Sequence, residues 1–223
     1  MFAINHAATA LIIKKRYPKA PLVLLLLSVQ FVEILWVLLN FLGIEHTSTD
    51  AVVNSVSEIH LEYMPYSHSL ASSVMFALIA WFVVGKLHKH RTAAIAVAIG
   101  AFSHIVLDVL THTRDISIIP FLLEQKVGIG LYAVPLVAFF VETVYGLFCW
   151  WIFQGSKALL AIILAFNLAN ISFFSVALKG PEVLMANHPI WIVSAVAVQI
   201  VVTLVLVGLL AKPRALVLEQ QTA

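Results

Sequence analysis

Residues 21–43 read PLVLLLLSVQFVEILWVLLNFLG, and this stretch decides the class of fold. A helix of roughly 20 apolar residues is long enough to cross the hydrocarbon core of a bilayer. The stretch lacks the alternation of apolar and polar residues that is typical of a membrane β-strand. We therefore predict a membrane-spanning helix that carries one acidic residue, Glu33.

Similar apolar runs follow along the rest of the chain. Of its 223 residues 62% are hydrophobic and 11% are charged, whereas soluble domains are about half apolar and a quarter charged. We predict an all-α, polytopic membrane helix bundle that forms a single transmembrane domain over residues 1–223. A short helix over 2–16 either lies at the membrane interface or inserts as a further span. The six expected spans lie at about 21–43, 67–87, 92–111, 129–153, 157–178 and 190–211.

The positions of the lysine and arginine residues indicate how the bundle is oriented. Most of them lie around residues 14–16, 86–91 and 157, which fall on one side of a bundle with this order of spans. Cytoplasmic loops of membrane proteins carry an excess of Lys and Arg. We therefore expect the basic loops in the cytoplasm. The small net charge of +2 gives no support for a nucleic-acid partner.

Ionisable residues inside the expected spans mark a candidate functional site. A charged side chain in a spanning helix is costly, so such residues face the interior of the bundle and are functional candidates. Near the end of the third span, His104, Asp108, His112 and Asp115 recur at intervals of three or four residues. This spacing places all four on one helical face.

Several of these ionisable residues fall at one depth. At a rise of 1.5 Å per residue, Glu33, His104 and Asp108 lie in the outer half of the bilayer, and His68 enters the same layer from outside. His6 reaches that layer if residues 2–16 insert, and this convergence favours insertion. Histidine and carboxylate groups are ligands of zinc and of other divalent metals such as manganese. The sequence therefore predicts a divalent-metal site within the bundle.

The pattern resembles that of a known family, the bacterial inner-membrane proteins described as membrane-bound, metal-dependent hydrolases, which are distantly similar to zinc-dependent phospholipase C and P1 nuclease. The resemblance covers roughly residues 1–150. This chain departs from the family by having Glu33 where aspartate is usual, and Tyr63-Met64 where a His-Arg pair is usual. The matching features are an early His6, the acidic Glu33 in the next helix, the Ser67-His68-Ser69 turn, and His104-x-x-x-Asp108 after Phe102-Ser103.

The resemblance implies an enzyme of the inner membrane that binds a divalent metal, zinc or manganese. It implies that the metal is held by His6, Glu33, His68, His104 and Asp108. Glu33 and Asp108 are also the expected catalytic residues, and Tyr66, His112 and Asp115 are expected at the mouth of the site. We expect the site to open to the outer leaflet and to hydrolyse a lipid-like or phosphoester substrate.

Two other functions are compatible with the same residues. Glu33, Asp108 and Glu142 lie on three different expected spans, so they could form the ion relay of a transporter or permease. Alternatively, the polar layer only joins the helices of a non-enzymatic membrane scaffold through interhelical hydrogen bonds.

Overall fold

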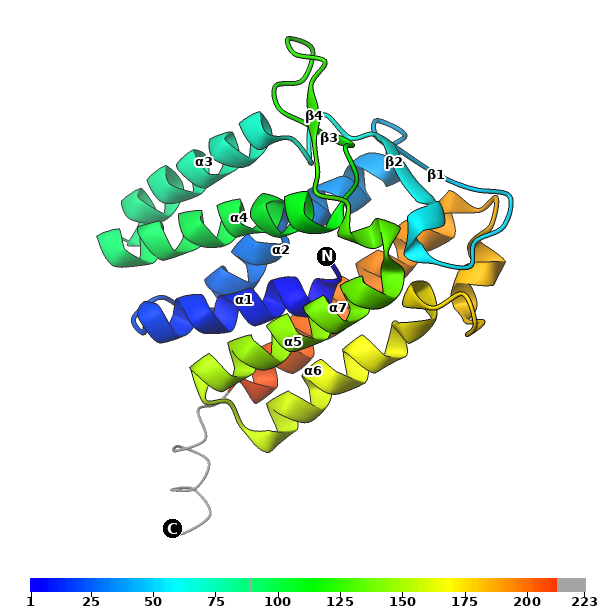
Figure 1. Cartoon of the computed structure of the whole chain (residues 1–223). Coiled ribbons are helices and arrows are strands. Elements are labelled where there is room, and N and C mark those ends of the chain that lie inside the picture. The colour runs from blue at the N-terminus through cyan, green and yellow to red at the C-terminus, as the bar shows by residue number, and fades with distance from the viewer. Residues whose placement is uncertain (89, 212–223) are drawn as a thin grey trace.

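The computed structural model describes residues 1–88 and 90–211 and shows a bundle of helices with two short β-hairpins (Figure 1). Within these ranges no closed sheet is present, and the predicted all-α class is confirmed. The helices are α1 (Ala3–Arg16), α2 (Leu22–Phe41), α3 (Leu70–His88), α4 (Arg91–Thr111), α5 (Pro135–Phe153), α6 (Lys157–Ala169) and α7 (Pro189–Leu210). The same ranges contain four short 3₁₀ helices, η1 (Val56–Glu58), η2 (Leu131–Ala133), η3 (Ile171–Phe174) and η4 (Pro181–Met185).

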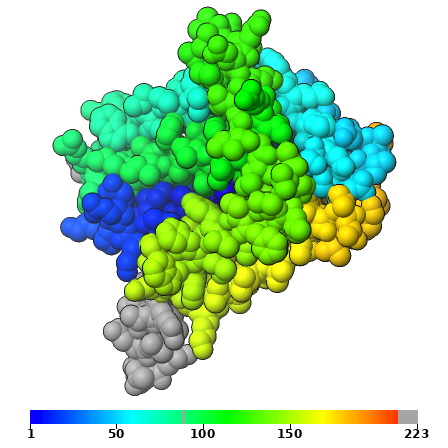
Figure 2. Space-filling model, viewed as in Figure 1, coloured from blue at the N-terminus to red at the C-terminus, as the bar shows by residue number. Residues whose placement is uncertain are grey.

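The two hairpins and the basic turns lie at opposite ends of the bundle. Strand β1 (His46–Thr49) pairs with β2 (Ile59–Tyr63), and β3 (Ile116–Ser117) pairs with β4 (Lys126–Val127), both antiparallel. We call this the hairpin end. The turns that join α1 to α2, α3 to α4 and α5 to α6 form the other end, the basic end. Figure 2 shows the segment that contains β3 and β4, in green, standing away from the helices.

Five helices of the described ranges are long and apolar enough to cross a membrane, namely α2, α3, α4, α5 and α7. Their outward faces carry large apolar side chains, among them Leu27, Leu78, Val144 and Val205, each of which is at least 45% exposed. Such a continuous apolar exterior would be unfavourable in water, and it suits a hydrocarbon surrounding. These features are consistent with a membrane protein.

Helix α5 begins six residues later than predicted, at Pro135 instead of residue 129. Proline favours the first position of a helix because its missing N–H has no helical partner there. The residues just before it form the separate turn η2, which follows Gly130 at a φ of +84°. This left-handed conformation suits glycine and separates the loop from the helix.

The predicted span over 157–178 is wrong in length, because helix α6 ends at Ala169. Its 13 residues extend only about 20 Å, short of the roughly 30 Å hydrocarbon core. The Asn170 side chain follows the last turn and donates to the Phe166 carbonyl, and its oxygen accepts from Gln199 of α7. The chain then turns through η3, although the following residues remain apolar.

The N-terminal helix α1 lies inside the bundle, between α2, α4, α5 and α7 (Figure 1). Ten of its 14 residues are buried, and several of these are alanines that allow close approach of the neighbouring helices. This position agrees with the alternative in which residues 2–16 insert. Helix α1 begins near the middle of the bundle, so it brings His6 to the level of the ionisable residues of α2 and α4.

Candidate metal centre

Four ionisable side chains from three segments meet inside the bundle. Glu33 comes from the middle of α2, His68 from the turn before α3, and His104 and Asp108 from successive turns of α4. Each offers one nitrogen or carboxylate oxygen, and these atoms all lie within 4.8 Å of one another. We call these four residues the metal group, because their arrangement could hold a metal ion.

The spacing of the donor atoms fits a small divalent cation. His68 Nε2 lies 3.3 Å from Glu33 Oε2 and 3.5 Å from Asp108 Oδ2, and His104 Nε2 lies 3.3 Å and 3.0 Å from the same two oxygens. Ligands about 2.0–2.1 Å from a tetrahedral metal are separated from one another by about 3.3 Å. Four nitrogen–oxygen separations thus match the edges of one coordination shell.

The tautomer of His104 is set by a backbone contact to the neighbouring helix. Its Nδ1 lies 2.8 Å from the Val29 carbonyl oxygen of α2, which can only accept a hydrogen bond. Nδ1 therefore carries the proton, and a neutral ring directs the lone pair of Nε2 toward the carboxylates. Among the described residues, neither His104 Nε2 nor Asp108 Oδ2 makes a hydrogen bond. A cation between them would satisfy both atoms.

His68 is oriented by a hydrogen-bonded chain that starts at Glu45. Glu45 is buried in the segment between α2 and β1, and its carboxylate accepts from the backbone N–H groups of Tyr66 and Ser67 at 2.9 Å each. The Ser67 hydroxyl donates to the second Glu45 oxygen at 2.5 Å and accepts from His68 Nδ1 at 2.8 Å. As in His104, the proton on Nδ1 leaves the lone pair of Nε2 for the metal group.

His6 lies beside the metal group but is not one of its four members. Its Nε2 is 3.3 Å from Asp108 Oδ1, the oxygen that also accepts from the Met1 amino group at 2.8 Å. Its ring stacks on the His104 ring, with centroids 3.9 Å apart and planes within 9°. The structure thus brings His6 to the site as a neighbour that supports two members, and its role as a direct ligand stays a prediction.

Glu142 of α5 belongs to a separate polar cluster. Its carboxylate accepts from the Phe2 backbone N–H at 3.0 Å, from Asn5 Nδ2 at 2.8 Å and from the Tyr132 hydroxyl at 2.8 Å. Burial and the nearby Glu142 carboxylate raise the pKa of Tyr132 well above its usual range, so Tyr132 remains a hydrogen-bond donor. Glu142 therefore fastens the start of α1 to α5.

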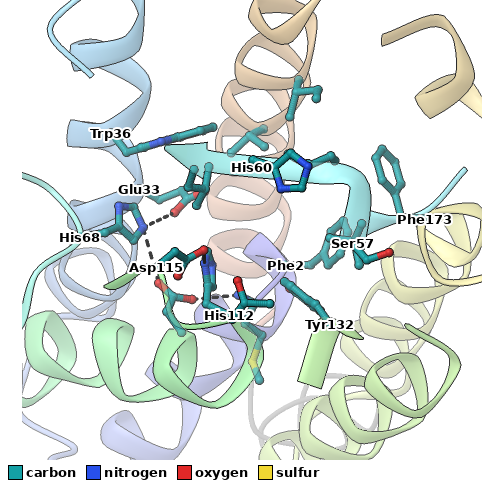
Figure 3. A pocket seen from close by; sticks show the side chains of 18 of the residues that line it. Phe2, Glu33, Trp36, Ser57, His60, His68, His112, Asp115, Tyr132 and Phe173 are labelled. Atoms are coloured by element: carbon teal, nitrogen blue, oxygen red, sulfur yellow. Dashed lines mark hydrogen bonds and ion pairs between the residues drawn. The ribbon is translucent and has the colours of Figure 1, made fainter. Parts of the chain in front are cut away.

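A cavity of about 430 Å³ adjoins the metal group (Figure 3). Glu33, His68 and Asp108 line one side of it, and Figure 3 shows the ring of His68 and the carboxylate of Glu33 directed toward each other. Two of the expected mouth residues, His112 and Asp115, also line the cavity. They contact each other, with 3.3 Å between His112 Nδ1 and Asp115 Oδ2.

The third expected mouth residue, Tyr66, does not line the cavity. Its side chain is 44% exposed and packs near the rings of Tyr63 and Phe121 on the hairpin end. Tyr66 contributes to the site through its backbone N–H, which donates to Glu45. The sequence carries no signal for this role, because a backbone N–H donor is common to every residue except proline.

The sequence also did not predict the role of Glu45 or the far wall of the cavity. Glu45 lies in a loop, where an acidic residue is usually solvated, and only the folded turn places it under Ser67. The far wall includes Phe173, Met185, Ile192 and Val196, all from the last third of the chain. Their apolar side chains resemble ordinary core or lipid-facing residues in sequence.

No protein-family model, no curated protein and no solved structure matches this chain. The geometry of the metal group and its cavity is therefore the basis for the functional argument.

Proposed function

We propose that this chain is a metal-dependent hydrolase of the membrane, with the metal group as its active centre. The observation that carries the proposal is that two histidine nitrogens and two carboxylate oxygens meet at metal-ligand spacing. In both histidines a hydrogen bond of Nδ1 fixes the tautomer that leaves Nε2 free to bind a metal. Two nitrogens and two oxygens are a donor set suited to zinc, and manganese is the alternative. The cavity beside the group gives a substrate access to it.

A bound divalent metal would supply a water molecule whose pKa is lowered toward 7, and it would polarise the bond to be cleaved. With the metal held by His68, His104 and Asp108, the fourth position would be open to that water, and Glu33 would be the better placed of the two carboxylates to accept its proton. It lines the cavity with 18% of its side chain exposed, whereas the Asp108 side chain is 2% exposed. Glu33 would hold that proton and return it to the leaving oxygen when the ester bond breaks and the water oxygen takes its place on the phosphorus or acyl carbon.

The metal content of the purified protein tests the proposal directly. We expect about one zinc or manganese ion per chain after loading, and loss of that ion in His104→Ala and Asp108→Asn. His188→Ala is the matched control, because His188 is exposed and stacks on Trp191 away from the site. Wild-type protein that is folded but resists loading with either metal would overturn the proposal.

The arrangement of Glu142 weighs against the transporter alternative. A relay needs carboxylates that can exchange protons or ions, but Glu142 is held by three donors next to the start of α1. The decisive measurement is ion flux in liposomes. A flux that disappears in Glu33→Gln would favour transport over hydrolysis.

The scaffold alternative makes a different prediction for the same residues. If the polar layer only joins helices, His104→Ala lowers the free energy of unfolding, and the wild-type protein binds no metal. Metal content separates the two alternatives, because His104 Nε2 and Asp108 Oδ2 lie 3.0 Å apart: a protonated His104 would pair with Asp108 in a scaffold, whereas both atoms would bind the metal in the hydrolase.

A further inference from the structure

The cavity beside the metal group has two unlike sides. One side is polar and includes Glu33, His68 and Asp108 of the metal group together with His112 and Asp115. The other side is mainly apolar and is formed by Phe2, Phe173, Met185, Ile192 and Val196, which we call the apolar wall, with Ser57 beside Phe2 and Phe173. In Figure 3, Phe2 and Phe173 lie across the cavity from His68 and Glu33.

The apolar wall is built by elements that contribute nothing to the metal group. Phe173 comes from η3, Met185 from η4, and Ile192 and Val196 from one face of α7. A site for a small, water-soluble phosphoester needs only polar contacts around the metal. Here the polar centre is joined to a space lined by side chains that gain free energy when hydrocarbon covers them.

The hairpin end supplies the charge that would suit an anionic group. Lys126 of β4 is exposed and lines the same cavity as His112, and so does the exposed Glu62 of β2. A phosphoester is negatively charged, so a divalent cation held by the metal group, together with Lys126, would favour its approach over that of a neutral ester. The cavity thus joins a site for an anionic ester to a hydrocarbon site within one enclosure.

We propose that the substrate is an amphiphile, an alkyl or lipid phosphoester whose ester group lies at the metal group and whose hydrocarbon chain lies along the apolar wall. This inference rests on the proposed function, because it assigns the substrate class of the same centre. It gives η3, η4 and α7 a role in selecting the hydrocarbon chain of the substrate. Soluble phosphoesters and neutral carboxyl esters are the classes that it excludes as preferred ligands.

Photolabelling measures this binding without requiring turnover. The probe is dodecyl phosphate with a diazirine near the end of the chain, added to metal-loaded protein in nanodiscs, irradiated and mapped by peptide mass spectrometry. We expect labels on η3, η4 and the first turns of α7. Unlabelled dodecyl phosphate should compete for this labelling, whereas inorganic phosphate and the neutral ester ethyl laurate should not. Labels confined to the outward faces of the helices, or competition by inorganic phosphate alone, would overturn the proposal.

A pair of variants on α7 sharpens the test. Val196→Trp fills the space along the wall, and we expect it to reduce specific labelling about tenfold, the effect of losing a modest part of the binding free energy. Val198→Trp is the matched control, because Val198 is 62% exposed on the outward side of α7, and it should leave the labelling unchanged. Equal labelling in both variants would contradict a role for the wall.

The two proposals fail in distinguishable ways. A protein that binds metal and hydrolyses short soluble phosphodiesters, but shows no specific labelling, would retain the proposed function and lose the amphiphile. A protein that shows the expected labels but binds no metal would lose the hydrolase and retain a lipid-binding cavity.

Discussion

At the scale of single residues, the site depends on groups that hold the two histidines in one tautomer. His104 uses a backbone carbonyl from α2, and His68 uses the chain from Glu45 through Ser67. A hydrogen-bond partner on the ring nitrogen that does not bind the metal fixes the orientation of a histidine ligand. Loss of such a partner typically lowers metal affinity by about 10- to 100-fold. Ser67 and Glu45 are therefore positioning residues of the metal group.

Substitution of Ser67 tests this role. Ser67→Ala removes the acceptor for His68 Nδ1, so we expect metal affinity to fall about 10- to 100-fold, as measured by competition with a chelator. Ser67→Thr keeps the hydroxyl and should retain most of the affinity. Ser194→Ala is the control, because the Ser194 hydroxyl contacts only the Ile190 carbonyl within the described residues. Equal affinity in Ser67→Ala and the wild type, with both folded, would contradict the positioning role.

At the scale of elements, the metal group requires a close approach of α2 and α4. Gly100 of α4 faces Ser28 of α2, and a Cβ atom at position 100 would lie 2.1 Å from Ser28 Oγ and 3.1 Å from its Cβ. One turn further along α4, His104 contacts the carbonyl of Val29. The absence of a side chain at Gly100 thus lets α4 bring His104 and Asp108 to Glu33.

We therefore expect Gly100→Ala to separate the two helices and to weaken both metal binding and stability. Overpacking of this kind typically costs about 1–3 kcal/mol in the free energy of unfolding, which thermal denaturation in detergent would measure. Gly85→Ala is the matched control, because its Cβ would meet Ala94 at an ordinary 3.6 Å. Adding Ser28→Ala should partly restore the Gly100→Ala protein. No difference between the two glycine variants would refute the explanation.

The helices show what the sequence could and could not predict at this scale. Hydropathy located the five long helices, because each needs a continuous apolar run, and helical spacing placed His104 and Asp108 on one face. The span that hydropathy predicted at α6 was too long, because the residues after Ala169 remain apolar although the chain turns there. The apolar wall escaped prediction because only tertiary packing brings η3, η4 and α7 to the metal group.

At the scale of the whole molecule, the two ends of the bundle differ in chemistry. The basic end carries Lys14, Lys15 and Arg16 in the last turn of α1, and Lys157 opens α6. The cavity and its lysine, Lys126, lie toward the hairpin end. If the basic end faces the cytoplasm, as the distribution of Lys and Arg predicts, then the site opens toward the opposite face of the membrane. An amphiphilic substrate would then enter from the outer leaflet.

Cysteine labelling in intact cells tests this orientation. The chain has one cysteine, Cys149, which is buried and can first be replaced by alanine to give an unreactive background. We expect a membrane-impermeant maleimide to label Leu122→Cys, because Leu122 is 80% exposed in the loop between β3 and β4. Lys15→Cys, at the basic end, should react only after the membrane is permeabilised. The reverse pattern would place the metal group on the cytoplasmic side, and a substrate of the inner leaflet would then follow from the same cavity.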